Sequence, residues 1–185
     1  SIMRNRIFVS MLALLWGLFA SRAAFAAPAQ QPLFLVTGVS PMVMFAMSAN
    51  HTLFKKAFAD YSDLNQDGII DITYTDSFDY YGYFDNKRCY SYASGLFSPE
   101  DPATGPYNHH CTGVSGDWSG NFLNWATMTR IDVIRKALFG GKRAVDTTSQ
   151  TVLERALLPS DVHSFVKVFD AAAIGDSTAN YTPYN

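Results

Sequence analysis

The chain has 185 residues, of which 48% are hydrophobic and 16% charged, and this composition is that of a globular protein of about one domain rather than of a disordered one. Its formal net charge is −2. Without the first 26 residues, which carry three Arg and no acid, 11 Lys and Arg face 16 Asp and Glu, a net charge of −5. This balance argues against nucleic acid as a partner and suits a protein that binds divalent cations.

The first 26 residues have the plan of a secretory signal peptide. Arg4 and Arg6 make a basic start, residues 7–20 are uncharged and mostly apolar, and small residues at Ala24 and Ala26 predict cleavage after Ala26. The apolar run is shorter than the roughly 20 residues that span a membrane. We therefore expect an exported protein that meets the membrane only during export, with an uncleaved anchor as the alternative.

The next elements follow from short apolar runs and their spacing. Residues 33–36 and 42–47 predict two strands, and the apolar positions of residues 52–61 recur at helical spacing. The Tyr-rich stretch after residue 71 predicts extended structure and turns, and residues 97–120 predict loop.

The second half of the chain contains the most regular helical pattern. Residues 121–139 predict one long helix, started near Ser119 or Asn121 and ended by Gly140. A short strand or turn at 143–145, a helix at 149–158 and a strand at 161–170 follow. The last residues are small and polar, so 171–185 predict a linker or the start of a truncated downstream region.

The stretch DLNQDGIID predicts a calcium loop. Asp63, Asn65 and Asp67 lie two residues apart, Gly68 permits a sharp turn, and the carbonyl of Ile69 and the side chain of Asp71 complete the set. Ca²⁺ takes six to eight oxygen ligands, which alternate side chains of a short loop can supply. The loop departs from an EF-hand because Tyr74 stands at the twelfth position, where an EF-hand has Glu. The alternative is a polar turn without an ion.

Cys89 and Cys111 are the two cysteines of the chain. An even pair in an exported protein predicts a disulfide. A metal site is the alternative, since His109 and His110 directly precede Cys111, although two adjacent histidines rarely bind one ion.

Four stretches within residues 32–155 stand out together: PLFLVTGVSPMVMF, DLNQDGIIDITY, DYYGYFDNKRCYSY and SGNFLNWATMTRIDVIRKALFGGKRAVDTTSQTVLE. In this order they resemble the N-terminal region of the PilC/PilY family, the large tip-associated adhesins of type IV pili.

The resemblance implies an α/β fold, a degenerate von Willebrand factor A-like, doubly wound domain over residues 27–170 with a Tyr-rich insertion and the calcium loop. The adhesion-type metal signature of such domains is incomplete here, because Ala46 replaces its Asp and Asn50 its second Ser, which leaves Ser48. The resemblance to this family also implies minor pilins and a host or abiotic surface as partners. It implies a location in the periplasm, at the pilus tip or on the cell surface.

The function expected from these observations is that of an exported, non-enzymatic adhesin or pilus-biogenesis module with one Ca²⁺. The chain has no G-x-S-x-G or H-E-x-x-H motif. An exported hydrolase or a carbohydrate-binding module that uses the tyrosines of YYGYF remains the alternative.

Overall fold

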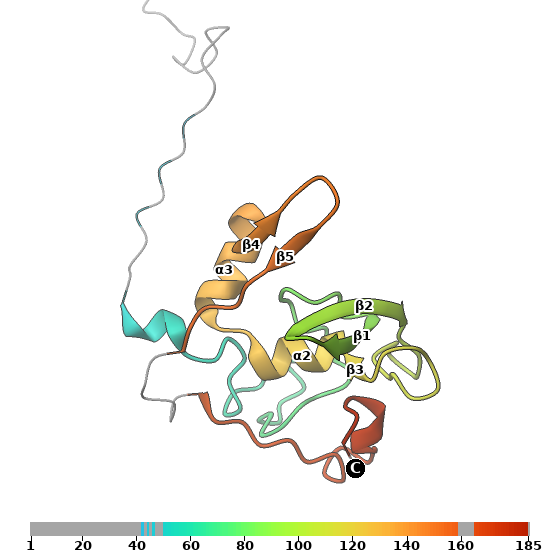
Figure 1. Cartoon of the computed structure of the whole chain (residues 1–185). Helices are drawn as coiled ribbons and strands as arrows, with labels where there is room; N and C mark the ends of the chain where they lie inside the picture. Colours follow the sequence, from blue (N-terminus) through green and yellow to red (C-terminus); the bar gives the residue numbers. More distant parts are fainter. Residues whose placement is uncertain (1–41, 43, 45, 47–49, 159–164, 185) are drawn as a thin grey trace, which may run out of the picture. The chain divides into compact units, whose positions relative to one another are not determined.

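The computed structural model describes residues 42, 44, 46, 50–158 and 165–184 (Figure 1). The chain has two compact units, Ser1–Met47 and Ser48–Asn185. The expected signal peptide, the strand at 33–36 and most of the strand at 42–47 lie outside the described residues. Among the helices described, none is long and apolar enough to cross a membrane.

A three-stranded antiparallel sheet forms around the Tyr-rich stretch. It consists of β1 (Arg88–Ala93), β2 (Leu96–Pro102) and β3 (Trp118–Ser119), in the order β2-β1-β3. Ser94 and Gly95 both have positive φ and make the two-residue turn that pairs Ala93 with Leu96. The prediction of loop from residue 97 is therefore wrong for β2.

A separate antiparallel hairpin joins β4 (Arg143–Asp146) to β5 (Thr151–Leu153). Of the strand or turn predicted at 143–145, the strand is confirmed, but the helix predicted at 149–158 is wrong. Thr147 closes the turn instead, because its backbone N–H donates to the Gln150 carbonyl at 2.9 Å and its hydroxyl accepts from the Gln150 N–H at 3.0 Å. Such local bonds compete with helix formation.

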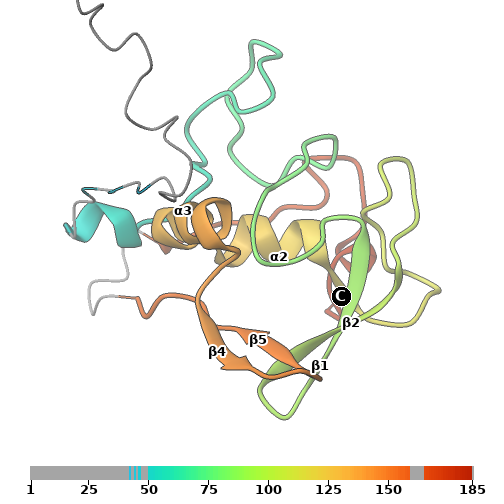
Figure 2. The same ribbon diagram turned by 90° about the horizontal axis from the view of Figure 1, so that it is seen from above.

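The long helix predicted at 121–139 is two helices, α2 (Gly120–Thr127) and α3 (Arg130–Phe139) (Figure 2). Both predicted ends are confirmed, with Ser119 as the N-cap of α2 and Gly140 in a left-handed conformation after α3. The break arises because residues 128–130 pair with residues 55–57. The Ala57 N–H donates to the Met128 carbonyl at 2.9 Å, and the Arg130 N–H to the Lys55 carbonyl at 3.1 Å.

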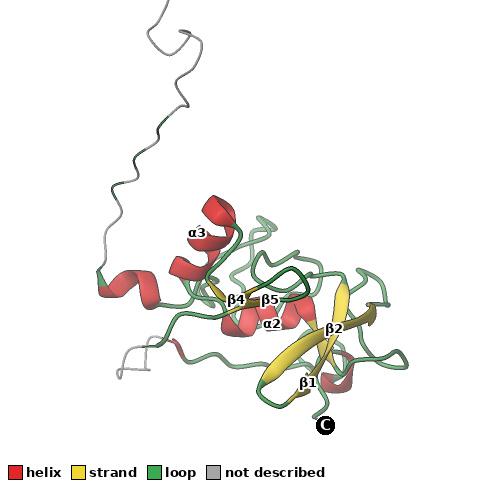
Figure 3. Ribbon diagram, turned by 45° about the horizontal axis from the view of Figure 1, so that its top comes forward, coloured by secondary structure: helices red, strands yellow, loops and turns green. Residues whose placement is uncertain are grey.

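The same pairing limits the helix predicted at 52–61 to the short 3-10 helix η2 (His51–Phe54), after which Lys55 is extended. In the strand predicted at 161–170, residues 161–164 lie outside the described residues, and residues 165–170 contain no strand. Figure 3 shows that loops make up much of this unit.

The α/β class is confirmed, but the doubly wound, von Willebrand factor A-like sheet is not seen in the described residues. Every pair of strands there is antiparallel, whereas a doubly wound fold is built on a mostly parallel sheet. The expected parallel core would require strands from the stretch before residue 50, which is almost entirely outside the described residues.

The core is largely aromatic and is built by segments far apart in sequence. Its buried members are Tyr74, Tyr80, Phe122, Trp125 and Tyr181. Tyr181 comes from the segment expected to be a linker. Its carbonyl accepts from the Ser119 N–H at 2.9 Å, and the neighbouring Asn180 carbonyl, in η4 (Thr178–Asn180), accepts from the Cys111 N–H at 2.8 Å. Residues 170–184 thus pack as part of the same unit.

Candidate functional site

The predicted calcium loop, residues 63–71, is an exposed turn whose side-chain oxygens face its own backbone. Asp63 accepts from the Asp67 N–H at 3.1 Å and from the Gly68 N–H at 2.8 Å, and Asp67 accepts from the Ile69 N–H at 2.8 Å. Gly68 has a φ of 89°, which a residue with a side chain rarely adopts. The glycine is therefore required for the turn, as its place in the sequence predicts.

The remaining predicted ligands fix the ends and the tip of this loop. Asn65 Oδ1 accepts from the Asp67 N–H at 3.2 Å, and Asp71 Oδ2 accepts from the Leu64 N–H at 2.7 Å. Ile69, whose carbonyl is the fifth predicted ligand, is 71% exposed. Its neighbour Ile70 is also exposed and does not anchor the loop in the core.

The adjacent histidines point into two different networks. His109 is fully buried, and its Nδ1 lies 2.7 Å from the Asp76 carbonyl and 3.1 Å from the amide of Asn121. Its Nε2 lies 3.0 Å from Asp79 Oδ1 and 3.1 Å from Lys87 Nζ. His109 therefore has protein partners at both ring nitrogens.

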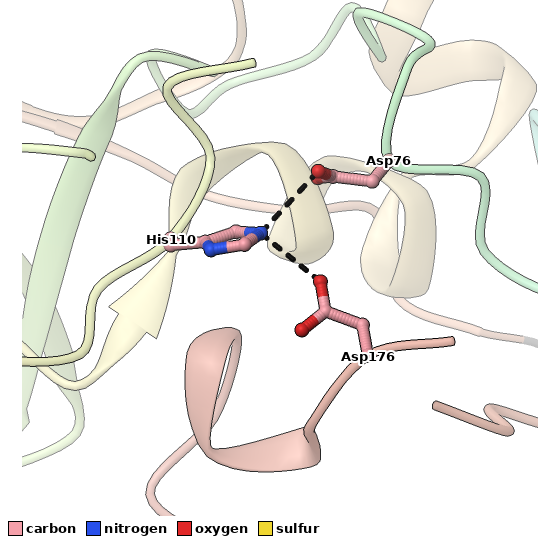
Figure 4. A group of neighbouring side chains, drawn as sticks. All are labelled: Asp76, His110 and Asp176. Carbon is pink, nitrogen blue, oxygen red and sulfur yellow. Dashed lines mark ion pairs between the residues drawn. The ribbon is translucent and has the colours of Figure 1, made fainter. Parts of the chain in front are cut away.

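His110 instead points to two carboxylates from distant parts of the chain (Figure 4). Its Nε2 lies 3.4 Å from Asp76 Oδ2 and 3.1 Å from Asp176 Oδ2. The Tyr181 hydroxyl lies 3.2 Å from the same nitrogen and donates to Asp176 Oδ2 at 2.6 Å. All three side chains of this His110 cluster, defined as Asp76, His110 and Asp176, are largely buried.

The pKa values of the two carboxyl groups lie below their usual range. Burial alone would raise the pKa of Asp76, but the hydrogen bond to His109 and the charges of His109 and His110 outweigh it. Burial also opposes the shift at Asp176, where bonds from Tyr181, the Ser177 N–H and Asn180 lower the pKa. Both groups are therefore held as carboxylates.

Sequence reasoning placed neither Asp76 nor Asp176 in a site. The cluster is formed by three loops and follows no metal-binding spacing in the sequence. The pair of histidines before Cys111 was the one feature of the sequence that indicated a metal site near His110. The predicted disulfide is confirmed, since Cys89 and Cys111 are bonded, and it anchors the loop that carries both histidines.

Two other sequence features have structural roles. Asn50, part of the incomplete adhesion-type signature, accepts a hydrogen bond from the Thr52 N–H at 3.1 Å and caps η2, while Ser48 lies outside the described residues. In YYGYF, Tyr80 is buried, Tyr83 is half-buried and Tyr81 is exposed. The stretch is therefore mainly core and does not form an open stacking platform for sugars.

Comparison with known proteins places the chain in a family. Residues 71–185 match the family described as PilY1 homolog, small alpha/beta domain. Two proteins of Xylella fastidiosa (strain Temecula1 / ATCC 700964), each called type IV pilus biogenesis factor PilY1 homolog, are similar to it. One is 39% identical over 142 residues, which is 76% of this chain, and the other 41% identical over 92 residues, which is 46%.

The chain belongs to this PilY1 homolog family, and the resemblance seen in the sequence is thereby confirmed. It spans 9% and 8% of the lengths of the two relatives. No solved structure matches the chain.

Proposed function

We propose that this chain is part of an exported, non-enzymatic protein that takes part in type IV pilus biogenesis and acts as an adhesin. The observation that carries the proposal is its membership of the PilY1 homolog family, two of whose members are named as type IV pilus biogenesis factors. The disulfide supports export, because disulfides persist in oxidising compartments. Residues 1–26 would serve as the signal peptide.

The partners in this proposal are minor pilins and a host or abiotic surface, and the location is the periplasm, the pilus tip or the cell surface. The region around the acidic loop offers an exposed apolar surface beside the proposed cation site. Ile69, Ile70 and Ile72 are 71%, 59% and 70% exposed. Exposed apolar groups rimmed by polar ones are typical of interaction sites.

The 63–71 loop would bind one Ca²⁺ through Asp63, Asn65, Asp67, the Ile69 carbonyl and Asp71. Its oxygens already face the inside of the turn, where they accept from backbone N–H groups. A cation would replace those bonds and remove the repulsion among three carboxylates in nine residues.

Deletion of the gene that encodes the chain tests the biological role. The proposal expects fewer surface pili and weaker attachment to a surface, restored by the intact gene supplied in trans. Normal piliation and normal attachment in the deletion strain would contradict it.

Calorimetric titration of the chelated and dialysed chain tests the calcium loop separately. We expect one Ca²⁺ per chain, a higher melting temperature with Ca²⁺, and loss of both in Asp67→Ala. Asp146→Ala, in the distant β4–β5 hairpin, is the control and should bind as the wild type does. Wild-type protein without binding heat at millimolar Ca²⁺ would leave only a polar turn.

A further inference from the structure

The His110 cluster surrounds a single ring nitrogen with more oxygens than it can satisfy. Nε2 carries at most one hydrogen, yet two carboxylate oxygens and the Tyr181 hydroxyl lie within 3.4 Å of it. The Tyr181 hydrogen is already donated to Asp176. The two carboxylates therefore converge on a nitrogen that can donate a hydrogen to only one of them, and the Tyr181 hydroxyl is the second donor, to Asp176 alone.

The outer oxygen of each carboxylate is held by other groups. Asp76 Oδ1 accepts from the Tyr74 hydroxyl at 3.1 Å and lies 3.2 Å from His109 Nδ1. Asp176 Oδ1 accepts from the Ser177 N–H at 2.7 Å and from the amide of Asn180. The Oδ2 atoms face His110, and Asp176 Oδ2 also accepts from the Tyr181 hydroxyl at 2.6 Å. The contacts of the Oδ1 atoms fix the direction of both carboxylates, in the way that outer groups orient metal ligands.

We propose that Asp76, His110 and Asp176 form a binding site for one divalent transition-metal ion, with Zn²⁺ as the best fit. The three ligand atoms lie within 4.8 Å of one another. Two ligands of a tetrahedral Zn²⁺ with bonds of about 2.0–2.1 Å are about 3.3 Å apart. The distances from Nε2 to the two carboxylate oxygens, 3.1 and 3.4 Å, match that edge.

The donor set separates this ion from the Ca²⁺ proposed for the 63–71 loop. One imidazole nitrogen and two carboxylate oxygens are typical zinc ligands, whereas Ca²⁺ and Mg²⁺ take oxygen ligands. Three protein ligands leave a fourth position to water. His109, with partners at both ring nitrogens, stays outside the coordination shell and supports Asp76 from behind.

The ion would fasten three loops together. Asp76 follows the acidic loop, His110 lies on the disulfide-anchored loop, and Asp176 belongs to the segment 170–184 that carries Tyr181 into the core. Metal removal should therefore loosen the 170–184 segment before the rest of the unit, and make it the first part that a protease cuts.

The test is a titration with Zn²⁺ of the exported, disulfide-bonded chain, purified without a polyhistidine tag and stripped with a chelator. We expect one Zn²⁺ per chain by calorimetry and elemental analysis, a higher melting temperature, and protection of the 170–184 segment. Asp176→Asn keeps the shape of the side chain and should weaken Zn²⁺ binding at least tenfold, as should His110→Gln. Asp67→Asn, in the acidic loop, is the matched control and should bind Zn²⁺ as the wild type does.

Two results would overturn the proposal. Equal Zn²⁺ affinity in the wild type and in folded Asp176→Asn would place the ion elsewhere. No Zn²⁺ uptake by the folded wild type would leave the His110 cluster an ion-pair network only. If both variants fail to fold, Co²⁺ added to the stripped wild type decides, because a four-coordinate nitrogen and oxygen site gives visible absorption and its absence refutes the site.

Discussion

The side chain of Asn124 makes three hydrogen bonds to the backbone of the Tyr-rich segment. Its amide donates to the carbonyls of Tyr80 and Phe84, each at 2.9 Å, and its oxygen accepts from the Phe84 N–H at 3.0 Å. The Asn124 side chain and Tyr80 are fully buried and Phe84 is half-buried, so the Tyr80 carbonyl has no solvent to replace this partner. Gly82 lies against the same amide, where a Cβ would come within 2.2 Å of Asn124 Oδ1.

Asn124→Ala should lower the free energy of unfolding by about 3 kcal/mol, because it leaves one buried and two half-buried backbone groups without their partner. Urea unfolding followed by circular dichroism measures the change. Gln150→Ala, at an exposed position of the β4–β5 turn, is the control and should change stability by less than about 0.5 kcal/mol. A loss at Asn124 no larger than at Gln150 would contradict this account.

The buried polar residues were not predictable from the sequence. Asn121, Asn124 and Asp132 interrupt or flank apolar positions of α2 and α3, and each is fully buried. An asparagine in a helix is ordinarily read as a solvent-facing residue. Its burial here depends on loops of the Tyr-rich segment that reach it from 40 residues or more away.

At the scale of elements, the break between α2 and α3 depends on Thr129. Its hydroxyl accepts from the Asp132 N–H at 3.2 Å and donates to the Asp132 carboxylate at 2.6 Å, which caps α3. Asp132 in turn accepts from the Ala156 N–H at 3.0 Å and from the Tyr83 hydroxyl at 3.1 Å. The cap therefore also fastens the chain after β5 and the Tyr-rich segment to α3.

Thr129→Ala should destabilise the chain by about 0.5–2 kcal/mol, the range for loss of an N-cap. Thr129→Ser keeps the hydroxyl and should retain most of the stability. Thermal unfolding of both variants tests the prediction. Equal losses in the two would show that the methyl group, rather than the cap, is responsible.

The sequence predicted the elements correctly where neighbouring residues determine them, and incorrectly where contacts with distant segments determine them. Ser119 and Gly140 mark the outer ends of the helical region as expected. The break at residues 128–130 was missed because it is set by pairing with residues 55–57, some 70 positions earlier. The helix predicted at 149–158 failed because the Thr147 turn and the β-branched residues after it favour a hairpin.

For the whole molecule, the disulfide joins Cys89 to Cys111, which are 22 positions apart in sequence, and closes a loop that holds His109 and His110. Replacing Cys89 and Cys111 together by Ser should lower the free energy of unfolding by about 3 kcal/mol in the chain-entropy model. Denaturant unfolding of the variant measures this. Unchanged stability of the variant, or two reactive thiols in the folded wild-type protein purified without reductant, would contradict the prediction.

The two candidate sites differ in the same way: one is formed by contiguous residues and the other by residues far apart in the sequence. The 63–71 loop is contiguous, so its turn and its glycine could be predicted, although whether it binds Ca²⁺ stays a prediction. The His110 cluster is assembled from residues 34 and 66 positions apart, and no spacing in the sequence indicates it. Family membership is recognisable because whole stretches, rather than single ligands, carry it.

The aromatic core makes the unit sensitive to alkaline pH. Tyr80 is fully buried, with rings of Phe58 and Phe78 each 4.9 Å away, and burial raises the pKa of its hydroxyl to about 12. Burial also raises the pKa values of Tyr74 and Tyr181. A tyrosine in the unfolded chain loses its proton near pH 10. Between these values the unfolded state holds fewer protons than the folded one.

Stability should therefore be unaffected by Tyr80 below about pH 10 and fall as the pH rises from about 10 to about 12. The slope from this group is at most about 1.4 kcal/mol per pH unit, the value for one proton. Urea unfolding at a series of alkaline pH values, with tyrosinate absorbance recorded alongside, measures it. Tyr80→Phe should be less stable at neutral pH, because the Thr75 N–H loses its partner at 3.1 Å, but its stability should fall less steeply with pH. The same slope in the variant and the wild type would show that Tyr80 does not carry the effect.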